Sequence, residues 1–341
     1  MLTLILDEPG RLVARDLPPP AAPGPGEALV RVHRVGVCGT DLHAFAGNQP
    51  FFTYPRVLGH ELGVEVLASG AGVTNVRAGD RCAVEPYLHC GTCVACRAGK
   101  PNCCRTLKVL GVHVDGGHRA RIVVPAAKLH VSTRLSFDQL ALVETLGIGA
   151  HAVDRAAVRP GEHVAVVGAG PIGLAVMQFA LAAGARVIPV DVSTSRLAFC
   201  QERLGLPDGV DARGDVPSAL AQLTGGDLPT AVFDATGNVA SMNAGFNLVA
   251  HGGRLILVGL AQAYVTFNDP NFHRRELTVL SSRNALPADF PRIIGLIEAG
   301  RIDTAPWITH RALLAQVPAV IVSWTEPASR VIKAMIEVPD A

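Results

Sequence analysis

Five of the chain's eight cysteines lie in one short stretch, CGTCVACRAGKPNCC, which begins at Cys90. Cys90, Cys93 and Cys96 follow a C-x2-C-x2-C spacing, and Cys103 and Cys104 come shortly after them. Four thiolates around one ion form a closed tetrahedral zinc site, which leaves no open position for a substrate. The spacing therefore predicts a structural zinc site, and by itself it leaves Cys103 and Cys104 as alternatives for the fourth ligand.

Cys38, His60 and Glu61 form a second candidate metal site of a different kind. A thiolate, an imidazole and a carboxylate together suit zinc. Cys38 comes just past the strand predicted in EALVRVHRVGVC, and the other two residues begin the strand predicted in HELGVEVLASGAGV. Neighbouring residues on a regular strand point to opposite faces, so both can bind one metal only where the backbone is irregular. Taken singly, each residue also fits a structural interpretation, as a buried thiol, a hydrogen-bonded imidazole or a surface carboxylate.

The segment VVGAGPIGLAVMQFA has the spacing G-x-G-x-x-G, which predicts a tight turn between a strand and a helix. Such a turn brings the helix N-terminus to the pyrophosphate of a dinucleotide, whereas the alternative is a flavodoxin-like turn. Asp191 lies 18 residues after Gly173, where a carboxylate binds the adenosine ribose and favours NAD over NADP. Arg196, close behind it, can instead bind a phosphate or cover the adenine. The predicted contacts of the turn are Gly168, Gly170, Pro171, Ile172 and Gly173.

The elements that must position these candidates fall into two predicted domains, and the fold class is α/β. Residues 1–150 show short alternating runs bounded by glycine and proline, which predicts a mostly β domain. Residues 151–283 alternate strands and helices, which predicts a doubly wound parallel sheet of the Rossmann type. The tail, 284–341, is predicted to rejoin the first domain, with an amphipathic helix in DFPRIIGLIEAGRID and another helix in PASRVIKAMIE.

Composition limits the possible functions. The chain has 341 residues, 49% of them hydrophobic and 17% charged, which suits two packed cores and excludes a disordered or fibrous protein. A net charge of +1 without a Lys/Arg cluster points to no nucleic acid and no membrane surface as partner. We expect no signal peptide and no membrane span, hence a cytoplasmic protein, in which clustered cysteines bind metal rather than form disulfides.

These motifs, in their order and spacing, resemble the zinc-dependent medium-chain dehydrogenases over essentially the whole chain. The resemblance lies in GVCGTDLHAFAG, YPRVLGHELGVEV, the cysteine stretch, ALVETLGIGAHAV and VVGAGPIGLAVMQFA. Glu144, in place of a cysteine, is similar to the sorbitol and threonine dehydrogenase branch. LKVLGVHVDGGHRARIVVP and FHRRELTVLSSRNA look closest to its L-gulonate and L-galactonate 5-dehydrogenases. The implied fold is a GroES-like catalytic domain joined to a Rossmann domain that binds NAD.

The resemblance implies a catalytic zinc as well as the structural one, two zinc ions per chain. Cys38 and His60 are then ligands of the catalytic zinc, with Glu61 as the third ligand. Glu144 either binds this metal or holds its water, and Thr145 stands where the family usually has proline.

For the structural zinc, the family spacing makes Cys104 the last ligand and leaves Cys103 a bystander, within a lobe of about residues 86–108. In the family, zinc activates the substrate hydroxyl and a relay carries the proton away. Thr40 and His43 match the relay positions, since a hydroxyl both accepts and donates and an imidazole titrates near neutral pH. The alternative for this pair is a local hydrogen bond and a surface histidine. Positions matching contacts to the nicotinamide side or the phosphates are Thr236, Val258, Gly259 and Arg283.

Glutamate ligands make a polar, anionic site that suits a polyhydroxylated substrate. We therefore expect NAD-dependent oxidation of a secondary hydroxyl of a sugar acid or polyol, in a homodimer or homotetramer. Cations that by type suit an aldonate carboxylate are Lys108, His113, Arg119 and Arg283. The rival enzymes are an L-threonine 3-dehydrogenase, a vicinal-diol dehydrogenase and a zinc-free quinone reductase. The rival outside the enzymes is a metal-stabilised NAD-binding sensor.

Overall fold

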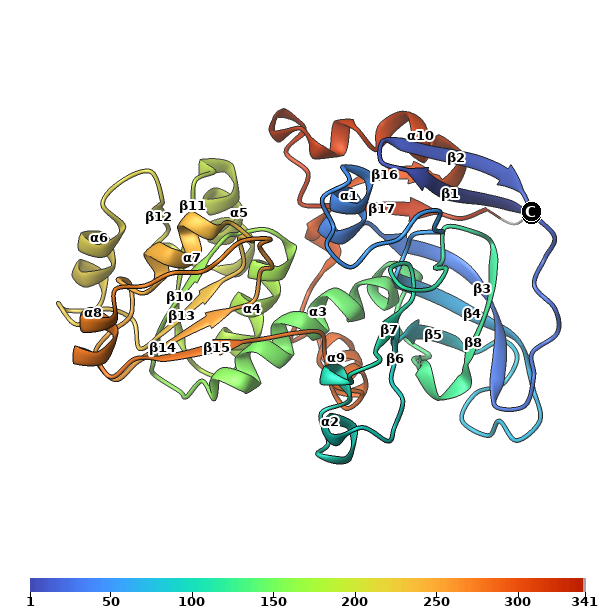
Figure 1. Ribbon diagram of the computed structural model, residues 1–341, viewed down its shortest axis with the longest axis horizontal. Helices are drawn as coiled ribbons and strands as arrows, with labels where there is room; N and C mark the ends of the chain where they lie inside the picture. Colours follow the sequence, from blue (N-terminus) through green and yellow to red (C-terminus); the bar gives the residue numbers. More distant parts are fainter. Residues whose placement is uncertain (340–341) are drawn as a thin grey trace. The chain divides into compact units, whose positions relative to one another are not determined.

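The computed structural model of this protein describes residues 1–339, and the chain forms two compact units (Figure 1). The first comprises Met1–Thr145 and Leu286–Ala341, so it is discontinuous in sequence, and the second comprises Leu146–Ala285. Each unit has a hydrophobic core of its own. In the described part of the chain, no helix has the length and apolar character needed to cross a membrane.

A seven-stranded sheet forms the centre of the first unit, in the order β16-β17-β3-β4-β5-β9, with β8 paired to β3. Buried and half-exposed residues alternate along β3, and its buried Ala28, Val30 and Val32 enter the core. This is the period of two expected for a strand with one face in the core. The strands of this unit are β1 (Leu2–Glu8), β2 (Arg11–Asp16), β3 (Glu27–Gly36), β4 (Glu61–Ser69), β5 (Arg81–Val84), β6 (Tyr87–Leu88), β7 (Lys108–Val109), β8 (Arg121–Pro125), β9 (Leu129–Val131), β16 (Ile308–Leu313) and β17 (Lys333–Glu337).

The prediction of a helix in PASRVIKAMIE is wrong, because its second half is strand β17. This strand pairs in parallel with β16 and antiparallel with β3, at the other end of the chain (Figure 1). Lys333, Ala334, Met335 and Ile336 are all buried. A strand covered on both faces carries a continuous apolar run rather than an alternating one, and this tertiary burial outweighs local helix preference.

Helix α3 (Phe137–Ala156) occupies a region whose sequence pattern predicts mostly strand and loop, and it crosses the boundary between the units. The Phe137 ring stacks on His33 of β3 with centroids 3.8 Å apart, and the guanidinium of Arg81 lies 4.8 Å from the centroid of the same ring. These contacts fix the start of α3 against the sheet, and so they also fix Glu144, two turns further on. The other helices of the first unit are α1 (Gly39–Phe45), α2 (Val94–Arg97), α9 (Asp289–Glu298) and α10 (Val317–Val320).

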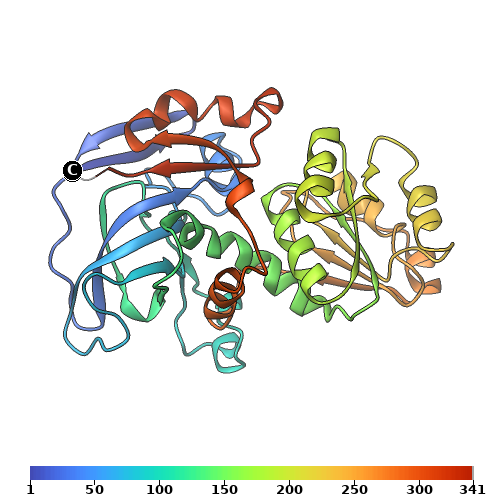
Figure 2. The same cartoon turned by 180° about the vertical axis from the view of Figure 1, so that it is seen from behind.

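The second unit is a six-stranded parallel sheet in the order β12-β11-β10-β13-β14-β15, with helices on both faces (Figure 2). In chain order this is the 3-2-1-4-5-6 arrangement of a Rossmann fold, whose ligand site lies at the carboxyl ends of the strands. The predicted α/β fold class is thus confirmed. The strands are β10 (His163–Val167), β11 (Arg186–Asp191), β12 (Val210–Asp211), β13 (Ala231–Asp234), β14 (Arg254–Leu257) and β15 (Thr278–Ser281). The helices are α4 (Pro171–Ala182), α5 (Thr194–Leu204), α6 (Val216–Leu223), α7 (Val239–Gly245) and α8 (Asp269–Arg274).

Candidate active site

One potential ligand atom from each of Cys38, His60 and Glu61 lies within 4.8 Å of the others. Cys38 follows β3 and stands at the N-cap of α1, and Glu61 is the first residue of β4. Gly59 has a φ of 96°, a left-handed conformation that interrupts the extended chain just before His60. His60 therefore lies outside the regular strand, which lets two neighbouring residues reach one point. A thiolate, an imidazole and a carboxylate this close together fit zinc.

The surroundings of His60 favour a positive charge. His60 is 5% exposed, and its Nδ1 lies 3.8 Å from Asp41 Oδ1. Burial lowers the pKa of His60, but the charges of Cys38 and Asp41 outweigh burial and hold this pKa well above its usual value. Among the described residues, neither His60 Nδ1 nor Asp41 Oδ1 has a hydrogen-bond partner. The same negative charges would stabilise a divalent cation. The electrostatics of the site, as well as its donor atoms, therefore fit a metal.

Asp41 supports this site, although the sequence analysis does not single it out. Its Oδ2 accepts a hydrogen bond of 2.9 Å from the backbone N–H of Cys38, while its Oδ1 faces His60. The available signal is its position three residues after Cys38, where an acidic side chain reaches back to the start of a helix.

Glu144 lies beside this group of donors rather than within it. It is 5% exposed, and its Oε1 accepts a hydrogen bond of 2.5 Å from the hydroxyl of Tyr87. Burial raises the pKa of Glu144, the charge of His60 opposes this shift, and the charge of Glu61 adds to it. The structure thus brings all four predicted residues of the catalytic metal site into one region, where Cys38 is half-buried and the other three are buried, with Tyr87 as a partner that no motif marks.

Lys333 is a buried cation of this region that the sequence analysis also misses. Its Nζ donates to both carboxylate oxygens of Glu61, at 2.7 Å each, and to the carbonyl oxygen of Val37 at 3.1 Å. Burial lowers the pKa of Lys333, but the carboxylate of Glu61 outweighs burial and raises this pKa above its usual value. Lys333 lies in β17, 272 residues after Glu61, so no local spacing in the sequence predicts this contact.

Thr40 and His43, the predicted relay residues, both lie on α1. They are three residues apart, a spacing that places side chains on the same side of a helix. Thr40 is half-buried, two residues after Cys38, whereas His43 is exposed and its Nδ1 lies 3.0 Å from Asn48 Oδ1. The helix thus offers a hydroxyl near the metal donors and an imidazole at the surface.

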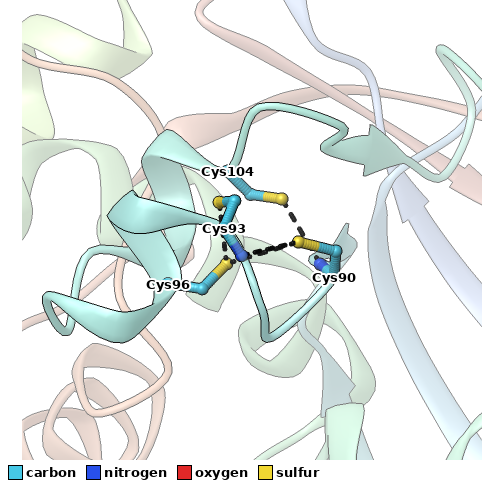
Figure 3. Close-up of side chains that lie close together, drawn as sticks. All are labelled: Cys90, Cys93, Cys96 and Cys104. Atoms are coloured by element: carbon cyan, nitrogen blue, oxygen red, sulfur yellow. Dashed lines mark hydrogen bonds between the residues drawn. The ribbon is translucent and has the colours of Figure 1, made fainter.

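The sulfur atoms of Cys90, Cys93, Cys96 and Cys104 point toward one another (Figure 3) and lie within 4.8 Å of one another. Cys96 Sγ is 4.0 Å from Cys90 Sγ and 3.5 Å from Cys93 Sγ. Cys103 is exposed and does not belong to this group. All the cysteines are free thiols, so the geometry supports a four-thiolate metal site and shows no disulfide.

Two thiols of this cluster differ in how readily they ionise. Hydrogen bonds from Thr92 and Cys93 lower the pKa of Cys90 to about 5. Partial desolvation, together with the hydrogen bond to Cys93, raises the pKa of Cys96 to about 12. Metal binding to the cluster must therefore displace protons, and it depends on pH.

The predicted residues of the glycine turn lie at the carboxyl end of β10. Gly170 is the N-cap of α4, and Pro171, Ile172 and Gly173 form the first turn of this helix. A Cβ on Gly173 would lie 1.7 Å from the carbonyl oxygen of Gly168, so only glycine allows the helix to pack this closely on the turn.

Asp191 ends β11 and is tied to this turn. Its Oδ2 accepts a hydrogen bond of 2.6 Å from the backbone N–H of Ala169, and its Oδ1 accepts one of 2.7 Å from the N–H of Ser193. Arg196, in α5, places a guanidinium nitrogen 4.0 Å from Asp191 Oδ2. The carboxylate therefore joins the glycine turn to the loop where an adenosine ribose is expected.

Asp234, a buried residue at the end of β13, organises the loops that carry Thr236, Val258 and Gly259. Its Oδ1 accepts hydrogen bonds from the backbone N–H of Thr236 at 3.0 Å and from the Thr236 hydroxyl at 2.7 Å. Its carbonyl oxygen accepts from the N–H groups of Val258 and Gly259, both at 2.9 Å. One residue that the motifs do not mark thus holds all three predicted nicotinamide contacts.

The cations proposed by residue type for a substrate carboxylate have varied surroundings. Lys108 and Arg283 are exposed. The Nδ1 of His113 accepts a backbone N–H at 3.2 Å, and Arg119 donates to a backbone carbonyl at 3.2 Å. The last two side chains therefore have local structural contacts.

Two sequence families match the chain. Residues 24–133 match the family described as "Alcohol dehydrogenase GroES-like domain", and residues 171–299 match the family described as "Zinc-binding dehydrogenase". The two matches together cover more than half of the chain.

Individual proteins match over nearly the full length. The chain is 44% identical over 313 residues to the L-galactonate-5-dehydrogenase of Escherichia coli (strain K12), covering 91% of both chains. It is similar to the solved short chain alcohol dehydrogenase (rspB) of E. coli CFT073 complexed with NADH, with a TM-score of 0.90 at 30% identity over 99% of both chains. A protein of Sinorhizobium meliloti 1021 solved with NADP gives a TM-score of 0.91 at 30% identity over 98% of both chains.

Proposed function

The chain belongs to the zinc-dependent medium-chain alcohol dehydrogenases, and on that premise we propose that it oxidises a secondary hydroxyl of a sugar acid or polyol to the ketone. It is an NAD-dependent zinc dehydrogenase acting on alcohols or polyols. The observation that carries the proposal is the 44% identity to an L-galactonate-5-dehydrogenase over 91% of both chains. The carboxylates of Glu61 and Glu144 support it, since they make the candidate metal site polar and anionic, which suits a polyhydroxylated substrate.

We assign Cys38 and His60 to the catalytic zinc, with Glu61 or Glu144 as the third ligand. The Nδ1 of His60 faces the carboxylate of Asp41, which leaves its Nε2 for the metal. When bound, the zinc supplies a Lewis acid that lowers the pKa of the substrate hydroxyl. Glu61 pairs with a lysine and Glu144 with a tyrosine, so each carboxylate has a protein partner when it is not on the metal.

We propose that Thr40 Oγ1 accepts the substrate proton and passes its own toward His43. The Nδ1 of His43 pairs with Asn48, which leaves Nε2 to receive the proton. The exposure of His43 supports this direction, because an imidazole at the surface can release the proton to water.

For the cofactor, we propose that the pyrophosphate lies at the N-terminus of α4 and the adenosine ribose at Asp191. After accepting two backbone N–H groups, this carboxylate keeps lone pairs for ribose hydroxyls, and its charge repels a 2′-phosphate. The loops that contain Thr236, Val258 and Gly259 then contact the nicotinamide side of the cofactor. Arg196 and Arg283 lie near the adenine or the phosphates. NAD, when bound, supplies the hydride acceptor.

A panel of aldonates and alditols, assayed with NAD and with NADP alongside zinc analysis, tests the proposal. We expect turnover of an aldonate or polyol with NAD, and about two zinc ions per chain from the two ligand sets. Activity confined to simple primary alcohols, or to L-threonine or vicinal diols, would contradict the substrate class. Cys38→Ser should abolish turnover while NAD still binds. Sedimentation of the full chain tests the homodimer or homotetramer that we also propose.

A further inference from the structure

Tyr87 links the two candidate metal sites. Its hydroxyl donates to Glu144 Oε1, and its backbone lies in β6, three residues before Cys90. We propose that Tyr87 is a positioning residue for Glu144 and that the four-cysteine lobe holds Tyr87 in place, so that the structural metal site controls how tightly the catalytic metal is held. This coupling goes beyond the proposed function and rests on its assignment of the two metal sites.

The cysteine lobe is the loop between β6 and β7, and these strands pair with Tyr87 opposite Val109. From Cys90 to Cys103, the one buried residue is Asn102. A loop with so little apolar burial has no core of its own, so the four sulfur atoms and the metal that fits them are what closes it. Closing the loop therefore holds together its two flanking strands, β6, which contains Tyr87, and β7, which pairs with it.

Lys128 contacts the chain on both sides of Tyr87. The Nζ of Lys128 pairs with the carboxylate of Glu85, two residues before Tyr87, and lies 3.2 Å from Nδ1 of His89, two residues after it. The backbone N–H of Glu85 also donates to the carbonyl oxygen of Lys128 at 2.8 Å. Because His89 adjoins Cys90, opening of the lobe pulls His89 from Lys128 and loosens the hold on Tyr87.

The hydroxyl of Tyr87 matters to Glu144 because the carboxylate is buried. Without this donor, one of its oxygens loses its partner, and an unpaired buried acceptor carries a desolvation cost. Without the Tyr87 hydroxyl to orient it, the carboxylate can turn away from its present direction, and this change competes with binding a cation or its water. Partners that orient metal-binding side chains typically change metal affinity by about 10–100-fold.

Chelator competition on the metal-loaded full chain measures the coupling in Tyr87→Phe, in Cys96→Ser and in the double variant. Cobalt distinguishes the sites, since a four-thiolate site and a one-thiolate site absorb differently. We expect the dissociation constant of the catalytic site to rise about 10–100-fold in each single variant, while Tyr87→Phe keeps the lobe metal. In the double variant the two losses should not add, because both act through one hydroxyl. Cys103→Ser, outside the sulfur group, is the matched control and should keep both metals.

An unchanged catalytic-site affinity in Tyr87→Phe would overturn the positioning role. If the losses of catalytic-site affinity add in the double variant, the lobe does not act on the catalytic site through Tyr87. Where Cys96→Ser does not fold, His89→Ala tests the same route with all four sulfurs present, and we expect a smaller loss there; no loss counts against the proposal. Metal affinity does not depend on the substrate, so an error in the proposed substrate class leaves this test decisive.

Discussion

Lys333 and Glu61 form a fully buried ion pair in which Nζ contacts both carboxylate oxygens at 2.7 Å. Glu61 is also one of three candidate ligands grouped within 4.8 Å. A metal bound to this group would therefore compete with the ammonium for one carboxylate. The ammonium of Lys333 compensates the charge of Glu61 in the protein interior. Removing this ammonium should therefore lower the free energy of unfolding most when no metal is bound.

Replacing Lys333 by methionine tests this relationship. Removing one partner of a buried ion pair costs about 3–5 kcal/mol, because the remaining charge stays unpaired. We expect that loss of unfolding free energy in chelator-treated protein, and a smaller loss with zinc, because zinc on Cys38 and His60 offers Glu61 another cation. Urea unfolding under both conditions measures the difference, with the exposed Lys108→Met as control. Equal losses in both conditions would show that Glu61 does not reach the metal.

Asp234→Asn tests whether the carboxylate at the end of β13 holds the nicotinamide loops. The amide nitrogen cannot accept a hydrogen bond, so the Thr236 or the Ser241 hydroxyl must turn to accept instead of donating, and the hydrogen bonds that remain no longer have a charged acceptor. We expect the dissociation constant of NADH to rise about tenfold, equivalent to about 1.4 kcal/mol, with unchanged zinc content. Fluorescence titration with NADH measures this, and the exposed Asp227→Asn is the control. Unchanged NADH affinity in Asp234→Asn would remove Asp234 from the cofactor site.

The choice between Cys103 and Cys104 is tested by serine at each position. Cys104→Ser removes a buried sulfur that also accepts the backbone N–H of Cys90 at 3.3 Å, so we expect loss of one zinc per chain and a less stable lobe. Cys103→Ser alters an exposed thiol and should stay within about 0.5 kcal/mol of the parent protein, with both metals retained. Zinc analysis and thermal unfolding of the two variants decide the matter, and the reverse pattern would exchange the two roles.

His118 should contribute to acid sensitivity. It is 1% exposed, and burial lowers its pKa from 6.5 to about 4. Between these values the unfolded chain binds a proton that the folded chain does not, so stability falls as the pH is lowered through this window. The shift corresponds to about 3 kcal/mol. We expect His118→Phe to flatten the loss of unfolding free energy between pH 6.5 and pH 4, measured by urea unfolding, and the exposed His251→Phe to leave it unchanged. An unaltered slope in His118→Phe would contradict this account.

Features whose residues are close in sequence could be predicted. The glycine turn at Gly168–Gly173 and the sulfur group at Cys90–Cys104 each occupy one short segment, so spacing predicts the turn and three of the four sulfurs, while the choice between Cys103 and Cys104 stays open. The grouping of His60 with Glu61 depends on a left-handed residue before them, which the chain meets with Gly59. A glycine at this position permits the left-handed conformation but does not predict it. The sequence therefore shows that His60 and Glu61 can bind one metal, not that they lie together.

Partners far apart in sequence could not be predicted. Tyr87 reaches Glu144 across 57 residues, and Lys333 reaches Glu61 across 272. Neither pair belongs to a repeat or a fixed spacing, because the sheet and α3 bring them together. The same long-range pairing turns the segment around Lys333 into strand β17, although its local pattern suggests a helix. Local preference decides little where burial between two strands outweighs it.

The distribution of amines on this protein has a practical consequence. Of its four lysines, Lys128 and Lys333 are buried against carboxylates, whereas Lys100 and Lys108 are exposed in and beside the cysteine loop. Apart from the N-terminal amine, which pairs with Asp16, reagents that acylate or alkylate amines therefore find their accessible side chains on one loop. Coupling to a solid support through lysine would hold the molecules by the same segment and give the immobilised layer one predominant orientation.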